Sequence, residues 1–98
     1  MASSFRFNEE KNQLLKATRG VTFEEVLDYI EKGNLLADVV HPNLRRPNQR
    51  LYVVKIGSYA YAVPYVINIS KQEIFLKTIF PSRALTRVYI QGGKHVEE

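Results

Sequence analysis

The sequence contains no cysteine and only two histidines, His41 and His95. Disulfide bonds, thiolate chemistry and a zinc site built from cysteine and histidine are therefore excluded, and we expect neither a metal nor a cofactor. No apolar run approaches the roughly 18 residues that a membrane helix needs. The opening MASSFRFNEE also lacks the apolar core of a signal peptide. These absences predict a cytoplasmic protein that does not insert into a membrane.

The chain of 98 residues is long enough for one domain and too short for two. A domain of this size buries roughly 60 to 65% of its unfolded surface, which supplies one modest core without a metal or a disulfide. We assign residues 1–90 to this domain. Residues 91–98, which include Gly92 and Gly93, are predicted to form a flexible tail.

The net charge of +4 is divided unevenly along the chain. Residues 1–40 hold five cations and seven anions, for a net charge of −2, whereas residues 41–98 hold nine cations and three anions, for a net charge of +6. This asymmetry favours nucleic acid or an acidic protein as partner. A sheet with solvated lysines would give a similar distribution.

The first forty residues predict a short extended segment followed by two helices. FRFN, residues 5–8, is long enough only for an edge strand or an anchoring arm. A helix should follow from about Glu9 to Arg19, with Asn8 as its N-cap and Gly20 as its left-handed end. Its buried residues are expected to be Leu14, Ala17 and Leu15.

The second helix has a stronger start signal, because Thr22 and Glu25 have the spacing of a capping box. Gly33 should end it. Its charged face is interpreted as solvated, since an acid–base pair of carboxylates would need one member buried among apolar groups. The predicted apolar face, at helical spacing, consists of Phe23, Val26, Leu27 and Ile30.

The remaining chain predicts strands at residues 35–40, 50–56, 59–68 and 73–80, with short connections that favour an antiparallel arrangement. Pro64 cannot donate to a sheet ladder, so the strand there should be bulged or at an edge. The predicted fold class is α+β: two N-terminal helices on a mainly antiparallel four-stranded sheet, with a short C-terminal helix and an optional N-terminal edge strand.

The strand at residues 59–68 has two different sides. Alternation places Tyr59, Tyr61 and Tyr65 on one side, and the small Ala60 and Ala62 on the other, where a helix could lie close. The tyrosine row is either core with hydroxyls at its rim or a platform on which bases stack.

The stretch EIFLKTIFPSRALTRVY, residues 73–89, should run as a strand through Pro81 into a short helix. Leu85, Val88 and Tyr89 are predicted to dock. Arg83 and Arg87, four residues apart, then share an outward face and could converge with Lys77 on a phosphate or carboxylate. The alternative is that these are solvated surface cations.

The loop HPNLRRPNQ carries Arg45 and Arg46 between two prolines. It could hold a phosphate, or it could be only a charged hairpin connection. A neutral imidazole titrates near physiological pH, so His41 could shuttle a proton, although a structural role is the favoured interpretation of a single histidine in a loop.

Three segments together resemble one family. FRFNEEKNQLLK, RGVTFEEV and IFPSRALTR resemble the BrnT family of bacterial toxins, and the likeness covers about residues 5–90. Two positions depart from the family pattern: Ala84 stands where a further arginine is common, and Arg19 replaces a frequent histidine. The resemblance implies a RelE-like ribonuclease fold and the toxin role in a type II toxin–antitoxin pair.

The resemblance further implies a metal-independent endoribonuclease that cleaves mRNA and is neutralised by a cognate antitoxin, through which it could also oligomerise. Cleavage would proceed by attack of the ribose 2′-hydroxyl on the adjacent phosphate. A non-catalytic protein- or RNA-binding module on the same fold is the alternative. The candidate roles are transition-state stabilisation by Arg83, Arg87 and Lys77, backbone binding by Arg45, Arg46 and Arg50, and proton transfer by His41, Tyr65 or Tyr89.

Overall fold

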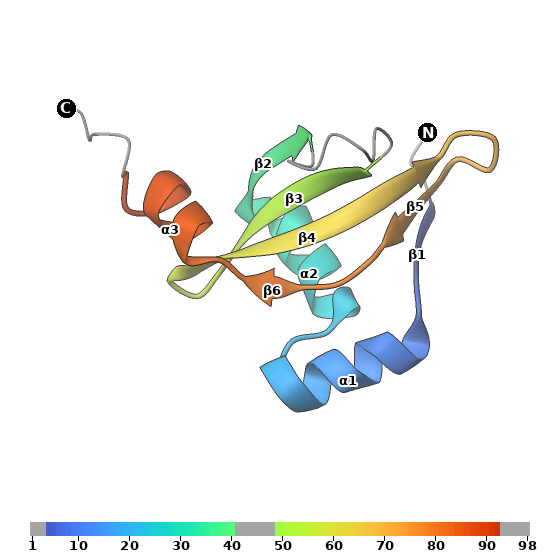
Figure 1. Ribbon diagram of the computed structural model, residues 1–98, viewed down its shortest axis with the longest axis horizontal. Helices are drawn as coiled ribbons and strands as arrows, with labels where there is room; N and C mark the ends of the chain where they lie inside the picture. Colours follow the sequence, from blue (N-terminus) through green and yellow to red (C-terminus); the bar gives the residue numbers. More distant parts are fainter. Residues whose placement is uncertain (1–3, 41–48, 93–98) are drawn as a thin grey trace.

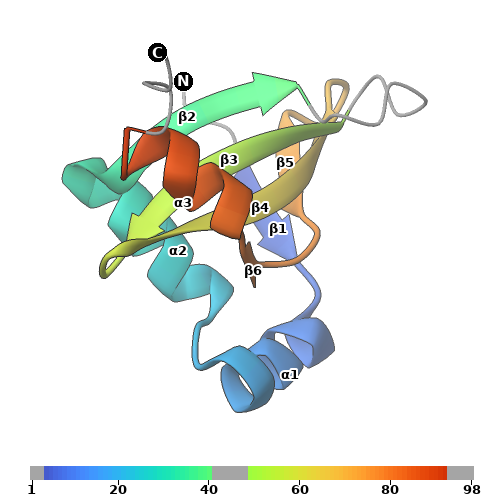
Figure 2. The same ribbon diagram turned by 60° about the vertical axis from the view of Figure 1, so that its left-hand side comes forward.

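The computed structural model describes residues 4–40 and 49–92. Its helices lie on both sides of one sheet, with α1 and α2 on one face and α3 on the other (Figures 1 and 2). This arrangement confirms the predicted α+β class. In chain order the elements are β1 (Ser4–Phe7), α1 (Glu9–Arg19), α2 (Phe23–Tyr29), a π-helical turn (Ile30–Asn34), β2 (Leu35–Val40), β3 (Gln49–Ile56), β4 (Tyr59–Asn68), β5 (Glu73–Leu76), β6 (Phe80–Pro81) and α3 (Arg83–Tyr89).

The sheet is mixed, with strand order β1-β5-β4-β3-β2 and β6 paired to β4. The predicted edge strand is present, and it runs parallel to β5 with Ser4 opposite Glu73. All other pairs are antiparallel. The described part of the sheet therefore has a parallel edge that the sequence did not predict.

The predicted strand at residues 73–80 is divided into β5 and β6. On β4, residues 65–68 pair with β5 and residues 61–62 pair with β6, so Pro64 falls between the two ladders. Because Pro64 has no N–H to donate, the ladder on the β5 and β6 side of β4 is interrupted there, whereas the ladder with β3 continues past it. In the segment that connects β5 to β6, Ile79 is fully buried.

Helix α1 has the predicted bounds and caps. Asn8 accepts a hydrogen bond from the Lys11 N–H at 2.8 Å, and Gly20 adopts the left-handed conformation with φ of 70°. Its buried face differs from the prediction. Leu15 is 1% exposed, but Leu14 is 54% exposed.

The rotation of α1 is explained by Asn12, which is buried although it is polar. Its side-chain oxygen accepts from the Phe23 N–H at 2.7 Å, and its amide donates to Glu24 at 2.8 Å. These bonds satisfy one of the free N–H groups at the start of α2. Turning Asn12 inward leaves Leu14 and Ala17 in solvent, so their predicted burial was wrong.

Helix α2 begins as predicted. The capping box is complete, because the Thr22 hydroxyl accepts from the Glu25 N–H and the Glu25 carboxylate accepts from the Thr22 N–H. Phe23 and Val26 are fully buried, and the Phe23 ring stacks on Phe7 with centroids 4.9 Å apart. These contacts fix α2 to the sheet and to the edge strand β1.

The two sides of the sheet carry separate apolar clusters. The side under α1 and α2 is built from large residues of both helices and of β3, β4 and β5, including Leu15, Phe23 and Leu76. The side under α3 contains Ala60 and Ala62, which lets the helix approach closely as predicted. Within the described residues no helix has the length and apolar character to cross a membrane.

Candidate functional site

Helix α3 is fixed on the sheet by a buried threonine. The Thr86 hydroxyl accepts from the Ala60 N–H of β4 at 2.8 Å and donates to the Ser82 carbonyl at 2.7 Å. Ser82 also caps the helix, since its side chain accepts from the Leu85 N–H at 3.1 Å. The helix that carries the candidate cations therefore has a defined position over β4.

The docking side of α3 differs from the prediction. Leu85, Thr86 and Ile90 face the sheet, whereas Val88 and Tyr89 are exposed. The cause is the Thr86 hydroxyl, which bonds to β4 and turns the helix so that Val88 lies outward. The expected docking of Val88 and Tyr89 was wrong.

Arg83 and Arg87 lie one helical turn apart on α3 and are both exposed. The ion pairs found within the described residues do not involve either of them. Both guanidiniums are therefore free of an acidic partner within residues 4–40 and 49–92. These ion pairs join Arg6 to Glu73, Lys32 to Asp28 and Arg50 to Asp38.

Lys77 is exposed just beyond β5 on the α3 side of the sheet. Its ammonium nitrogen is 5.7 Å from the centre of the Phe75 ring. The Lys77 backbone bonds to Pro64 and the Ser82 backbone to Ala60, four residues along β4. At about 3.3 Å per strand residue, Lys77 and the start of α3 attach roughly 13 Å apart.

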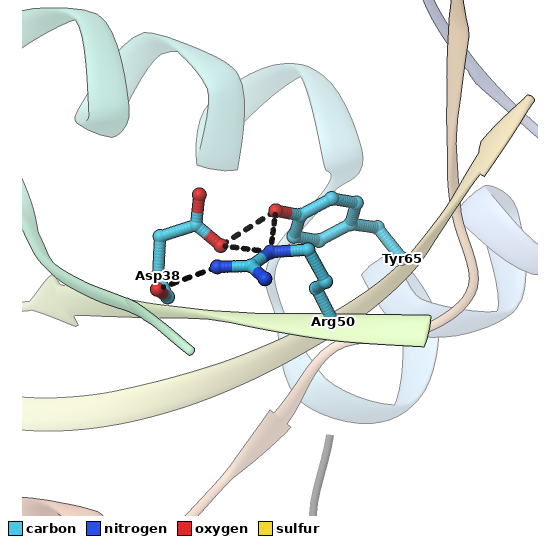
Figure 3. A network of polar contacts seen from close by, with 3 residues as sticks. All are labelled: Asp38, Arg50 and Tyr65. Carbon is cyan, nitrogen blue, oxygen red and sulfur yellow. Dashed lines mark hydrogen bonds and ion pairs between the residues drawn. The ribbon is translucent and has the colours of Figure 1, made fainter. Parts of the chain in front are cut away.

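Arg50 belongs to a polar network on the opposite side of the sheet (Figure 3). Its Nε donates to Asp38 Oδ1 at 3.2 Å and to the Tyr65 hydroxyl at 3.1 Å, and its terminal nitrogen donates to the Asp38 carbonyl at 3.0 Å. The Tyr65 hydroxyl donates to Asp38 Oδ1 at 2.5 Å. The network joins β2, β3 and β4 close to both ends of segment 41–48.

Burial raises the pKa of Tyr65, and its hydrogen bond to Asp38 raises that pKa further. The pKa of Tyr52, which stacks on Tyr65 with centroids 4.0 Å apart, is also raised by burial. Hydrogen bonds to Tyr65 and Asp38 raise the pKa of Arg50. A phenol held neutral and already bonded to a carboxylate is a poor proton donor.

The predicted site residues thus fall on two faces. Lys77, Arg83, Arg87 and Tyr89 belong to the α3 side, whereas Arg50 and Tyr65 point to the α1 and α2 side. Tyr89 is two residues after Arg87, about 200° around the helix axis, so the two side chains leave α3 on opposite sides. His41, Arg45 and Arg46 lie outside the described residues.

Sequence reasoning missed Asp38 and Thr86, which have no local signature. Asp38 is an isolated carboxylate in an apolar strand, and only the register that places it opposite Tyr52 brings it to Tyr65. In the sequence Thr86 looks like an ordinary helical residue, because the Ala60 N–H that bonds to its hydroxyl is 26 residues away. For Thr86, which is buried, the signal is a polar group in an apolar setting, and it becomes visible only when the position of β4 is known.

Replacing Thr86 by valine should lower the free energy of unfolding by about 1 to 3 kcal/mol, because the buried Ala60 N–H loses its acceptor. Urea denaturation measures this change. Thr18→Val is the matched control, since the exposed Thr18 hydroxyl bonds only to Leu14 of its own helix; it should change stability by less than about 0.5 kcal/mol. Equal effects would contradict the anchoring role of Thr86.

The raised pKa of Tyr65 predicts a stability that depends on alkaline pH. An unfolded tyrosine ionises at about pH 10, whereas folded Tyr65 keeps its proton above that value. The contribution of Tyr65 to the free energy of unfolding is therefore complete below about pH 10 and is lost as pH rises. Each such group adds a slope of up to about 1.4 kcal/mol per pH unit. Urea denaturation between about pH 9 and 11 should show that the free energy of unfolding of Tyr65→Phe falls less steeply with pH than that of the unchanged protein. Parallel pH dependences of the two proteins would contradict the assignment.

Within the described segments, no group of three or more histidine, aspartate or glutamate side chains could hold a metal ion. On the α3 side, Lys77, Arg83 and Arg87 are exposed and supply positive charge. Such charge can bind phosphate and stabilise negative charge that develops on it.

No protein-family model and no curated protein matches the sequence. Among solved structures, an arginine-to-alanine double mutant of the Escherichia coli toxin RelE in the free state is similar, with 18% identity and a TM-score of 0.48, over 96% of this chain and 99% of that one. The isolated E. coli RelE toxin is similar at 19% identity and a TM-score of 0.46, over 98% and 100% of the two chains. At these values neither likeness identifies the activity of this chain.

Proposed function

We propose that this chain is the toxin of a toxin–antitoxin pair and acts as a metal-independent endoribonuclease on mRNA in the cytoplasm. The observation that carries the proposal is the pair of exposed arginines, Arg83 and Arg87, on a helix that Thr86 bonds to the sheet. A fixed pair of guanidiniums suits a phosphodiester, because each can donate two parallel hydrogen bonds to phosphate oxygens.

In the proposed reaction the ribose 2′-hydroxyl attacks the adjacent phosphorus. The new P–O bond closes a cyclic phosphate, the bond to the 5′-oxygen breaks, and that oxygen takes up a proton. Negative charge grows on the non-bridging phosphate oxygens, and Arg83 and Arg87 would stabilise it, with Lys77 binding the backbone nearby. Of the proposed proton-transfer groups, His41 is kept, whereas Tyr89 leaves α3 on the side opposite Arg87 and is not aimed at the phosphate that Arg87 would bind. Arg50 would act by holding β2 and β3 together.

Incubation of the purified protein with single-stranded RNA in the presence of EDTA tests this proposal. Cleavage that continues in EDTA and leaves cyclic phosphate ends supports a metal-independent ribonuclease. Intact RNA, with or without bound protein, argues against it.

A non-catalytic binding module on the same fold is the second candidate. It is favoured by the state of Tyr65, whose hydroxyl is bonded to Asp38 and lies on the sheet face away from α3. In that case α3 would receive RNA or an acidic segment of the antitoxin. Tight complex formation with RNA in EDTA without cleavage would support this reading.

The antitoxin partner can be tested independently of chemistry. A small acidic or ribbon-helix-helix protein encoded by the adjacent reading frame should bind this chain and abolish growth arrest on co-expression. Absence of binding between the two purified proteins would remove the toxin–antitoxin assignment.

A further inference from the structure

The α3 side of the sheet carries an exposed aromatic ring beside the helix. Figure 2 shows α3 over β3 and β4, with β5 and β1 to one side of it. In β5, Leu76 is fully buried in the core under α1 and α2, and the alternation of the strand turns Phe75 to the α3 side. Phe75 is 39% exposed there. A large apolar ring is thus presented on an open strand surface.

Two cations flank this ring. Lys77 places its ammonium 5.7 Å from the ring centre, and Arg6 is the register partner of Phe75 on β1. Arg6 also contacts Glu73 at 3.4 Å, but its side chain is largely exposed. An exposed ion pair of that length contributes little, so Arg6 can exchange Glu73 for another anion.

From this arrangement we infer that Phe75 is a stacking platform for one nucleobase of single-stranded RNA, with Lys77 and Arg6 binding the flanking phosphates. The inference rests on the proposed RNA substrate. Aromatic rings accept any base because every base has a π-face, and cations beside the ring bind the sugar-phosphate chain that carries it. Charge complementarity favours RNA over an apolar peptide, which would offer Lys77 no anion and Arg6 none besides Glu73.

The position of Phe75 indicates its role. It precedes Lys77 by two strand residues, or about 7 Å, and Lys77 in turn attaches to β4 roughly 13 Å from the start of α3. Phe75 therefore lies about 20 Å along the sheet from the start of α3, so the stacked base would belong to a nucleotide a few positions away from the one at Arg83 and Arg87. Phe75 is a positioning residue, which should affect KM more than kcat.

The chain offers a matched control for this residue. Phe5 is also 39% exposed and lies on the neighbouring strand, but it is the register partner of Ile74 and points to the opposite face. Because the sequence has no tryptophan, Phe75→Trp and Phe5→Trp each introduce a single indole. An RNA oligonucleotide should quench the fluorescence of Phe75→Trp and leave Phe5→Trp unchanged, and an oligonucleotide of abasic sites should quench neither.

Loss of the ring gives a second measurement. Phe75→Leu should weaken binding of an unstructured RNA oligonucleotide about 5- to 150-fold, the range reported for removal of one stacking ring. Phe75→Tyr should bind as the unchanged protein does, and so should Phe5→Leu. Thermal unfolding of each variant separates a binding loss from a folding loss.

The outcomes separate this inference from the proposed function. If Phe75→Leu binds RNA as tightly as the unchanged protein, the stacking platform is excluded while ribonuclease activity is untouched. If Phe75→Leu loses binding to the antitoxin but keeps binding to RNA, the face is a protein interface and the inference is also overturned. An unchanged protein that neither binds nor cleaves RNA overturns the proposed function and the platform together, whereas binding without cleavage leaves the platform standing.

Discussion

Replacing Arg83 or Arg87 by alanine should lower the rate of RNA cleavage about 100- to 1,000-fold, the usual cost of removing one aimed donor from a site that stabilises developing charge. Growth arrest caused by expression without antitoxin should be lost in both variants. The rate is measured on a labelled RNA oligonucleotide in EDTA, at substrate concentrations that separate kcat from KM.

Lys16→Ala is the charge-matched control, because Lys16 is exposed on α1, which packs on the opposite face of the sheet. It should leave cleavage unchanged. Arg83→Lys and Arg87→Lys keep the charge but lose the two-pronged hydrogen bonding of a guanidinium, so partial activity is expected. Unchanged cleavage in both alanine variants would remove the proposed site from α3.

Leu15→Ala and Leu14→Ala should differ widely in stability although they are the same change at adjacent positions. Leu15 is 1% exposed in the core, and its truncation should lower the free energy of unfolding by about 2 to 5 kcal/mol. Leu14 is 54% exposed, and leucine and alanine are both good helix formers, so a change within about 0.5 kcal/mol is expected. Urea denaturation of both variants measures the difference.

This comparison tests the rotation of α1 that Asn12 sets. If Leu14→Ala costs as much as Leu15→Ala, α1 is turned differently and the hydrogen bond from the Phe23 N–H to Asn12 is not formed. Asn12→Ala offers a separate check, because it should destabilise the protein by leaving that N–H without its acceptor.

The sequence predicted the elements whose signals are local. The bounds of α1 follow from Asn8 and Gly20, which act on the residues next to them, and the capping box of α2 is complete within four residues. The bounds of β2 and β4 match the prediction for the same reason, since turn residues end each strand.

What the sequence could not predict depends on contacts between distant residues. The inward turn of Asn12 needs α2 beside it, and the docking side of α3 needs the Ala60 N–H beneath Thr86. Helical spacing alone allows an apolar stripe that includes Leu14 on α1, and one that includes Val88 on α3. A hydrogen bond across the fold decided both cases.

The candidate site shows the same limit. Residue type and spacing placed Arg83 and Arg87 together on one helix, and the structure places both exposed on α3. The assignment of Arg50 and Tyr65 to the same site required strand register, which sets them with Asp38 on the other face. Phe75 was not singled out because only the sheet distinguishes it from the buried residues beside it.

The parallel pairing of β1 with β5 also sets an order for folding. Ser4 pairs with Glu73, so both N-terminal helices and three strands lie between the two partners in the sequence, whereas β3 and β4 pair across a short turn. The entropy of loop closure grows with the length of the intervening chain, so the β3–β4 hairpin should form first and the β1–β5 edge later. Local opening of the folded sheet should accordingly begin at the β1 edge.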